Sequence, residues 1–237
     1  MARSHLACTW VGTVGADAGY ADSVLPDACT DVIWNGERLF VAGPDTGPVA
    51  MARIPGTFAA GVRFLPGHGS LFFGLPAADI RDQRVDADAI WGARTVDRWR
   101  DQLEGLAPGD AARALETCVA TTRVDDDRTA LTDAVAQFAH ESIESIAGNL
   151  GITTRTLHRR CLHAFGYGAK TLQQVLRFRR FLALAECRPQ ATIGQLAADA
   201  GYADQSHCHR DCVRLSGSSP SALLVSRGVR SVQDATR

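Results

Sequence analysis

The sequence contains no apolar run of the roughly 18 residues that a membrane-spanning helix needs. Residues 1–7 lack the apolar core of a secretory signal. The seven cysteines are an odd number without a CxxC pair, which argues against a disulfide framework, a zinc ribbon and a thioredoxin-like site. We therefore expect a protein of the reducing cytosol rather than a membrane or secreted protein. Its 237 residues suffice for one large domain or two modest ones.

Catalytic signatures are missing as well. The sequence has no nucleophile elbow, Walker loop, HExxH pair or Rossmann fingerprint, so we expect neither an enzyme nor a cofactor. Cys29 and His68 are possible metal ligands, but two soft ligands on separate loops are a weak signal, and a core or turn role is favoured. Trp34 and Trp91 are interpreted as packing residues rather than as stacking partners of a cofactor.

Charge is uneven along the chain, although the total is only −1. Residues 128–237 carry 14 basic and 8 acidic side chains, a net +6, whereas residues 1–127 carry 11 and 18, a net −7. The opposite charges of the two halves suggest that only the C-terminal half contacts a polyanion. A solvated charged surface would have the same composition, so charge alone leaves both interpretations open.

The first part of the chain has the pattern of a small β domain, because short apolar runs alternate with turn signals. Asn35-Gly36 between two such runs indicates a hairpin, and we expect a barrel or sandwich. The apolar runs occupy residues 31–34, 39–42, 62–64 and 71–73.

From Ala77 onward the spacing of apolar residues predicts helices, notably over residues 96–103 and 111–119. These helices could pack on their own β domain or against a partner chain. Residues 124–128 are interpreted as a loop before the last domain. The predicted division is a β-rich domain (1–90), a helical linker or dimerisation region (91–127) and a last domain (128–237).

The last hundred residues contain an internal duplication with an offset of 50. Residues 142–151 read SIESIAGNLG and residues 192–201 read TIGQLAADAG. Each copy begins with a hydroxyl residue suited to cap a helix, Ser142 or Thr192, and ends in a glycine that can adopt a positive φ. Each copy therefore predicts a short helix followed by a tight turn.

A second helix follows each turn, with the offset increased to 51. Residues 156–161 then align with residues 207–212, which places Leu157 and Cys161, and likewise Cys208 and Cys212, on one inward face. Gly166 and Gly217 close the two copies. The pattern helix, glycine turn, helix is the helix-turn-helix unit, whose second helix enters a major groove of DNA.

A helix over residues 170–185 is predicted between the copies, and Pro189 prevents its continuation. About 17 helical residues span ~25 Å. Together with the packing at its ends, this rod could hold two recognition helices roughly one DNA turn (~34 Å) apart. One monomer would then read two successive major grooves on one face of the duplex.

Residues 128–226 resemble the DNA-binding domain of the AraC/XylS family of bacterial transcription regulators, most specifically over residues 200–220. The N-terminal half is similar to the small β-rich domains of actinobacterial regulators over residues 26–34 and 61–67. The resemblance implies an α+β protein, with a small β-barrel or sandwich-like domain and linker helices preceding an all-α domain of two helix-turn-helix units. It makes residues 1–90 the sensor or regulatory domain and residues 128–237 the DNA-binding domain. Cys161 and Cys212 stand where the family usually has Phe, and Gly168-Ala169-Lys170 where it often has Ser-Pro.

The resemblance also implies which side chains meet DNA, because the family reads bases with the first half of each second helix. Arginine suits guanine and glutamine suits adenine, whereas contacts to phosphate only position the protein. The expected base-reading residues are Arg155, His158, Arg159, Gln205, Ser206, His207, His209 and Arg210. The expected phosphate contacts are Lys170, Arg177, Arg179, Arg180 and Arg214.

Double-stranded operator DNA is therefore the expected partner, in the cytoplasm and at the nucleoid. RNA polymerase, a small-molecule effector and a second copy of the chain are further possible partners. A metal- or thiol-responsive regulator is the alternative, because Cys208 and Cys212 share a helix face beside His207 and His209. The repeat favours a core role for both cysteines.

Overall fold

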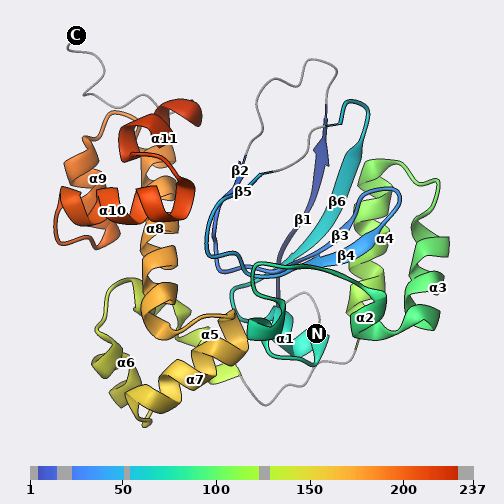
Figure 1. The fold of residues 1–237 in the computed structure, drawn as a ribbon, viewed down its shortest axis with the longest axis horizontal. Coiled ribbons are helices and arrows are strands. Elements are labelled where there is room, and N and C mark those ends of the chain that lie inside the picture. Colours follow the sequence, from blue (N-terminus) through green and yellow to red (C-terminus); the bar gives the residue numbers. More distant parts are fainter. Residues whose placement is uncertain (1–4, 15–22, 51–53, 123–128, 229–237) are drawn as a thin grey trace.

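The computed structural model describes residues 5–14, 23–50, 54–122 and 129–228. The N-terminal part (residues 5–122) holds an antiparallel sheet, and the C-terminal part (residues 129–228) is helical, which confirms the expected α+β fold. In Figure 1 the C-terminal helices lie on one side of the sheet, and two helices of the N-terminal part lie on the other side. The predicted loop at residues 124–128 and the segment 1–4 lie outside the described residues.

The main sheet has five strands in the order β1-β6-β3-β4-β7, and every neighbouring pair is antiparallel. The turn after β3 confirms the predicted hairpin, because Gly36 has a φ of 90° and Asn35 N–H donates to the carbonyl of Arg38. A separate two-stranded sheet pairs β2 with β5. The strands are β1 (Leu6–Thr13), β2 (Ser23–Val24), β3 (Asp31–Trp34), β4 (Leu39–Ala42), β5 (Val49–Ala50), β6 (Phe58–Phe64) and β7 (Arg84–Asp86).

Helices α3 (Ala93–Leu103) and α4 (Pro108–Ala120) confirm the predicted helical spacing. α4 packs against β1, β3 and β6, and its apolar face shares one core with the strands. Val96 and Leu103 of α3 are buried in the same core. The helical stretch between residues 91 and 120 thus covers the sheet of its own chain.

The predicted positions of the strands need three corrections. Residues 71–73 belong to helix α1 (Gly69–Phe73), not to a strand. All five residues of α1 are buried, and a short run that is apolar on every side carries no period that distinguishes a helix from a strand. Strand β7 also interrupts the stretch expected to be helical, and β1 was not predicted because most of its residues are exposed.

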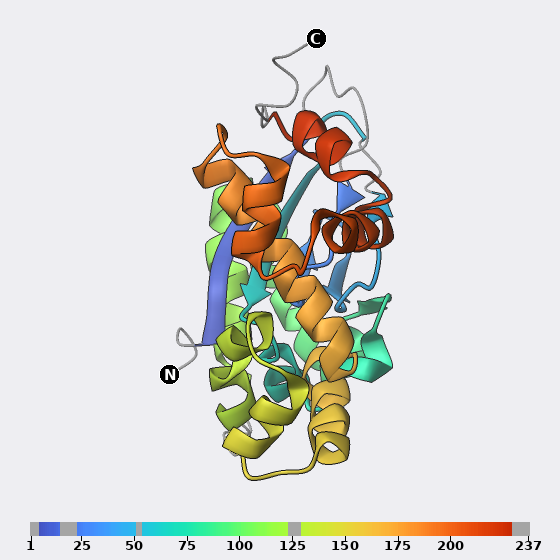
Figure 2. The same ribbon diagram turned by 90° about the vertical axis from the view of Figure 1, so that its left-hand side faces the viewer.

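The C-terminal part consists of two helix-turn-helix units joined end to end by α8 (Ala169–Cys187), as predicted. Figure 2 shows α8 running lengthwise in front of the sheet. The first unit is α6 (Ile143–Asn149) with α7 (Thr154–Phe165), and the second is α9 (Ile193–Ala200) with α10 (Gln205–Ser216). α5 (Thr129–Asp133) and the 3-10 helix η4 (Val135–Ala139) precede them, and α11 (Pro220–Ser226) closes the chain.

Local sequence signals set the boundaries of the two units. The Ser142 side chain accepts from Ser145 N–H, and Thr192 forms a reciprocal capping box with Gln195. Gly151 and Gly201 both have positive φ, at 64° and 93°, as the tight turns require. The duplicated pattern is therefore confirmed at both helix starts and both turns.

The inward positions predicted from the repeat are also confirmed. Leu157, Cys161, Cys208 and Cys212 are all fully buried. They belong to one C-terminal core that includes Phe178 and Phe181 of α8 and residues of every neighbouring helix. Cysteine is small enough to occupy these sites within the packed helices.

The two parts of the molecule touch along α7 and α8. α7 packs against α1 and against the 3-10 helix η2 (Ala77–Ile80). Arg81 Nη1 donates to the carbonyl of Gly166 at 3.0 Å, and Arg179 Nη1 donates to the carbonyl of Asp27 at 2.8 Å. The ring of Phe165 lies so close to Gly67 that a Cβ there would be 2.5 Å from it. Glycine at 67 therefore permits this close approach.

Candidate nucleic-acid interface

The first turns of α7 and α10 are the exposed ends of the two units. Thr153 and Asp204 cap these helices, since their side chains accept from Thr156 N–H and His207 N–H. Figures 1 and 2 place both first turns on the side of the C-terminal part that faces away from the sheet. Both helices are thus anchored at a defined start and open to solvent.

The three base-reading candidates of α7 lie together. Arg155, His158 and Arg159 are all exposed and line one shallow hollow of about 470 Å³. The His158 ring packs on the backbone of Gly168, because a Cβ at that position would lie 2.3 Å from His158 Cε1. The departure from the usual Ser-Pro at the start of α8 therefore makes room for this imidazole.

The candidates of α10 divide into two groups. Ser206, His209 and Arg210 are exposed, and the side-chain amide of the exposed Gln205 lies over Gly194 of α9. His207 is half-buried, with its ring edge-on to Tyr202 at 5.1 Å between centroids. The second unit thus presents fewer fully exposed candidates than its sequence alone indicates.

Behind α10 lies a polar cluster that the sequence interpretation missed. Asp211 is only 3 % exposed, and its Oδ1 accepts from Gln174 Nε2 at 3.1 Å. His207 Nε2 lies 3.8 Å from Asp211 Oδ2, and Arg214 Nη1 donates to Gln174 Oε1 at 2.6 Å. The sequence did hold one signal of this cluster, because the charged Asp211 stands directly beside the inward Cys212. This cluster joins α10 to α8.

The phosphate candidates differ in their surroundings. Lys170, Arg180 and Arg214 are exposed, and Arg180 hydrogen-bonds to His140. Arg177 is half-buried, with its guanidinium 5.7 Å from the ring centroid of Tyr202. Arg179 points to the N-terminal part through its bond to Asp27. All five stay predictions, and each of the four arginines has an existing contact that competes with phosphate.

The cysteines of α10 form a close pair, with Cys208 Sγ and Cys212 Sγ 3.9 Å apart in the core. Their mutual hydrogen bond and burial raise the pKa of the Cys212 thiol far above its usual range. Burial, with the nearby Asp27 carboxylate, likewise raises the pKa of the Cys29 thiol to about 12. Such thiols are poor nucleophiles near neutral pH. Among the described residues, no group of three or more His, Cys, Asp or Glu side chains is placed to hold a metal ion.

No helix in the described part of the chain combines the length and apolar character of a membrane span.

Two families match parts of the chain. Residues 3–86 match a family described as a domain of unknown function (DUF6597), and residues 146–225 match a family described as a helix-turn-helix domain. No curated protein sequence matches the chain.

Similar solved structures include two of ToxT from Vibrio cholerae. ToxT from strain O395 has a TM-score of 0.49 at 11 % identity, covering 92 % of this chain and 96 % of ToxT. Wild-type ToxT from strain SCE256 with bound unsaturated fatty acid has a TM-score of 0.47 at 12 % identity, covering 95 % and 98 %. These likenesses are too distant to carry a functional argument.

Proposed function

We propose that this chain, whose residues 146–225 form a helix-turn-helix domain of the AraC type, is a transcription regulator that binds double-stranded DNA with both of its units. One observation carries the proposal: two helix-turn-helix units with matching caps and turns lie at the two ends of one helix. Each exposes the first turn of its second helix. A single unit would read one groove, whereas a linked pair can read two.

The length of α8 supports the use of successive grooves. Its 19 residues span about 28 Å at 1.5 Å per residue. Because α7 and α10 lie beyond its two ends, their separation can approach the ~34 Å between major grooves on one face of B-form DNA. The rod is stiffened by seven buried side chains along its length.

Specificity would come from the exposed side chains of α7 and α10. Arg159 and Arg210 occupy the same position in the two units, three residues before Leu162 and Val213, and both are open to solvent. A bidentate arginine contact discriminates guanine by roughly 1–3 kcal/mol. Lys170, Arg180 and Arg214 would add phosphate contacts that position the helices without reading sequence.

The proposal is tested by selecting DNA from a random pool with the full chain and measuring its affinity by fluorescence anisotropy. Two recognition elements about ten base pairs apart are expected in the selected sequences. Inserting five base pairs between the elements turns them to opposite faces and should weaken binding at least tenfold. Affinity should also fall steeply with salt, because phosphate contacts release counterions. A flat salt dependence, or no enriched sequence, would refute the proposal.

The N-terminal part would supply regulation by binding an effector, by dimerisation, or by both. Its contact with α7 and α8 provides a physical connection to the DNA-binding helices. Contact with RNA polymerase and action on the cytoplasmic nucleoid belong to the same proposal. Size-exclusion chromatography with light scattering, with and without selected DNA, tests the dimer.

A further inference from the structure

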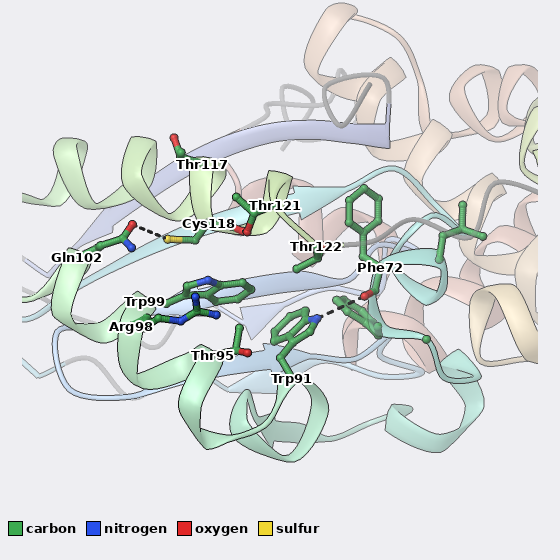
Figure 3. A pocket seen from close by; sticks show the side chains of 13 residues that line it. Phe72, Trp91, Thr95, Arg98, Trp99, Gln102, Thr117, Cys118, Thr121 and Thr122 are labelled. Atoms are coloured by element: carbon green, nitrogen blue, oxygen red, sulfur yellow. Dashed lines mark hydrogen bonds between the residues drawn. The ribbon is translucent and has the colours of Figure 1, made fainter.

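A pocket of about 1040 Å³ opens among the helices of the N-terminal part (Figure 3). α1, α3 and α4 line it, together with Trp91 of the short helix α2 (Asp88–Trp91). None of the lining residues belongs to a described strand, so the pocket lies beside the sheet and not within it. Small organic molecules bind to proteins in pockets of roughly this volume.

One side of the pocket is apolar and held rigidly. Phe72 and Trp99 are only 3 % and 4 % exposed, and the rings of Trp91 and Trp99 are 5.0 Å apart between centroids. Trp91 Nε1 donates to the carbonyl of Phe72 at 3.4 Å, which fixes the orientation of its indole. Such an aromatic wall favours a ligand with a planar or aliphatic apolar body.

The other side presents hydrogen-bond donors. Arg98 is the one charged residue of the lining, and no ion pair or hydrogen bond is found for its guanidinium within the ranges that the structure describes. Gln102 Oε1 accepts from Cys118 Sγ at 3.5 Å, which leaves the amide NH₂ of Gln102 as a donor. Figure 3 shows Arg98 and Thr95 on α3, across from Thr117 of α4 and the two threonines that follow this helix, Thr121 and Thr122.

We propose that this pocket binds a small amphipathic carboxylate. The apolar body would lie against Phe72, Trp91 and Trp99, and the carboxylate would pair with the Arg98 guanidinium. The planar fork of arginine matches a carboxylate with two parallel hydrogen bonds. A single cation balances one negative charge, which favours a carboxylate over a doubly charged phosphate.

The position of α1 gives the pocket a way to act on DNA binding. α1 lines the pocket through Leu71, Phe72 and Phe73, and it also packs against α7. Gly67, two residues before α1, lies directly against Phe165 at the end of α7. Ligand that displaces α1 would therefore shift α7, which carries Arg155 and Arg159. This step rests on the proposed function, whereas binding in the pocket does not.

Isothermal titration calorimetry on the full chain tests the binding with three acids: phenylacetate, phenylbutyrate and octanoate. We expect saturable binding of at least one acid, and about tenfold weaker binding of its uncharged amide, because a hydrogen bond between charged groups is lost. Arg98→Gln should weaken the acid about tenfold and leave the amide unchanged. Arg98 is exposed, so this variant should retain the wild-type melting temperature.

Arg113→Gln is the matched control, because Arg113 is an exposed arginine of α4 outside the lining, paired with Asp110. It should bind the acids as the wild type does. If none of the three acids binds saturably, or if the acid binds equally to wild type and Arg98→Gln, the proposal is overturned.

Anisotropy on the selected DNA, with and without the bound acid, tests the connection to α7 separately. A change of at least threefold in DNA affinity, abolished by Arg98→Gln, is expected. Unchanged DNA affinity at saturating acid would refute the connection through α1. Failure of the wild type to bind any DNA would refute the proposed function and would leave the calorimetric result intact.

Discussion

The two helix-turn-helix units share a motif but differ in what surrounds them. α7 of the first unit packs against α1 and η2 of the N-terminal part, whereas α9 and α10 of the second unit pack against α8, α11 and each other. Phe165 at the end of α7 corresponds to Ser216 at the end of α10. The phenylalanine is buried against Gly67, and the serine hydroxyl bonds back to the carbonyl of Cys212.

This difference shows which positions serve the motif and which serve the interface between the two parts. Caps, turns and inward residues match in both copies because each copy must form the same two helices. The C-terminal end of the second helix differs because Phe165 of α7 packs there against Gly67 of the N-terminal part. The N-terminal part is therefore placed to influence the first unit directly and the second through α8.

The largest expected effect concerns this interface. Phe165→Ala should lower the free energy of unfolding by about 3–5 kcal/mol, because it empties a fully packed site between the two parts. Ser216→Ala, at the matching position of the second unit, should change it by less than about 1 kcal/mol. Urea denaturation monitored by circular dichroism measures both. Equal losses in the two variants would contradict the asymmetry between the units.

DNA affinity tests whether both units read sequence. Arg159→Ala and Arg210→Ala should each weaken binding to selected DNA by about 1–3 kcal/mol and relax the preference at different positions of the site. Anisotropy at fixed salt gives the affinities, with Arg113→Ala as a control far from the C-terminal part. If only one of the two variants binds more weakly, a single unit carries recognition.

The polar cluster behind α10 has no counterpart in the first unit, where the exposed Arg160 takes the place of Asp211. Asp211→Ala should lower stability by about 1–2 kcal/mol, because Gln174 Nε2 loses its acceptor. Arg160→Ala should stay within about 0.5 kcal/mol of the wild type. Thermal unfolding of both variants checks this, and a stable Asp211→Ala protein would show that the cluster does not hold α10 in place.

The smallest expected effects concern the caps. Thr192→Ala should cost about 1 kcal/mol, because the Thr192 hydroxyl accepts from Gln195 N–H and also bonds to Gln195 Oε1, whereas the bond from the backbone N–H of residue 192 to Gln195 Oε1 can remain. Ser142→Ala should cost about half as much, because the cap of α6 is a single bond to Ser145 N–H. Urea midpoints of the two variants give the comparison. A larger loss for Ser142→Ala would mean that α6 depends on its cap more than α9 does.

Much of the C-terminal part could be predicted from sequence. Capping residues, turn glycines and apolar spacing act within a few residues. The roles of Thr192, Gly201 and Cys212 can therefore be predicted from their near neighbours in the sequence. Strands β3 and β4 were predictable for the same reason, because a hairpin signal joins two apolar runs. Helix α1 was not, since its five residues are buried on all sides and show no period.

The sequence predicted which positions belong to the candidate site, but not which of their side chains are free of other contacts. The apolar spacing between the two copies places Arg177 and Arg179 on the same helix as Lys170 and Arg180, but it does not indicate their different partners. Arg179 meets Asp27, which lies 152 residues away in the chain. Likewise, the pocket beside Arg98 forms only where α1, α3 and α4 converge, and no local sequence pattern predicts that convergence.

The order of amino acids alone was enough to establish two capped helix pairs and the rod between them, because those features depend on hydrogen bonds and apolar spacing over a few turns. Packing in three dimensions decided which arginines stay in solvent, how α7 meets the sheet-bearing part, and where a cavity forms. Those outcomes depend on contacts between segments far apart in the chain. The free energies of such contacts cannot be inferred from any short stretch of residues.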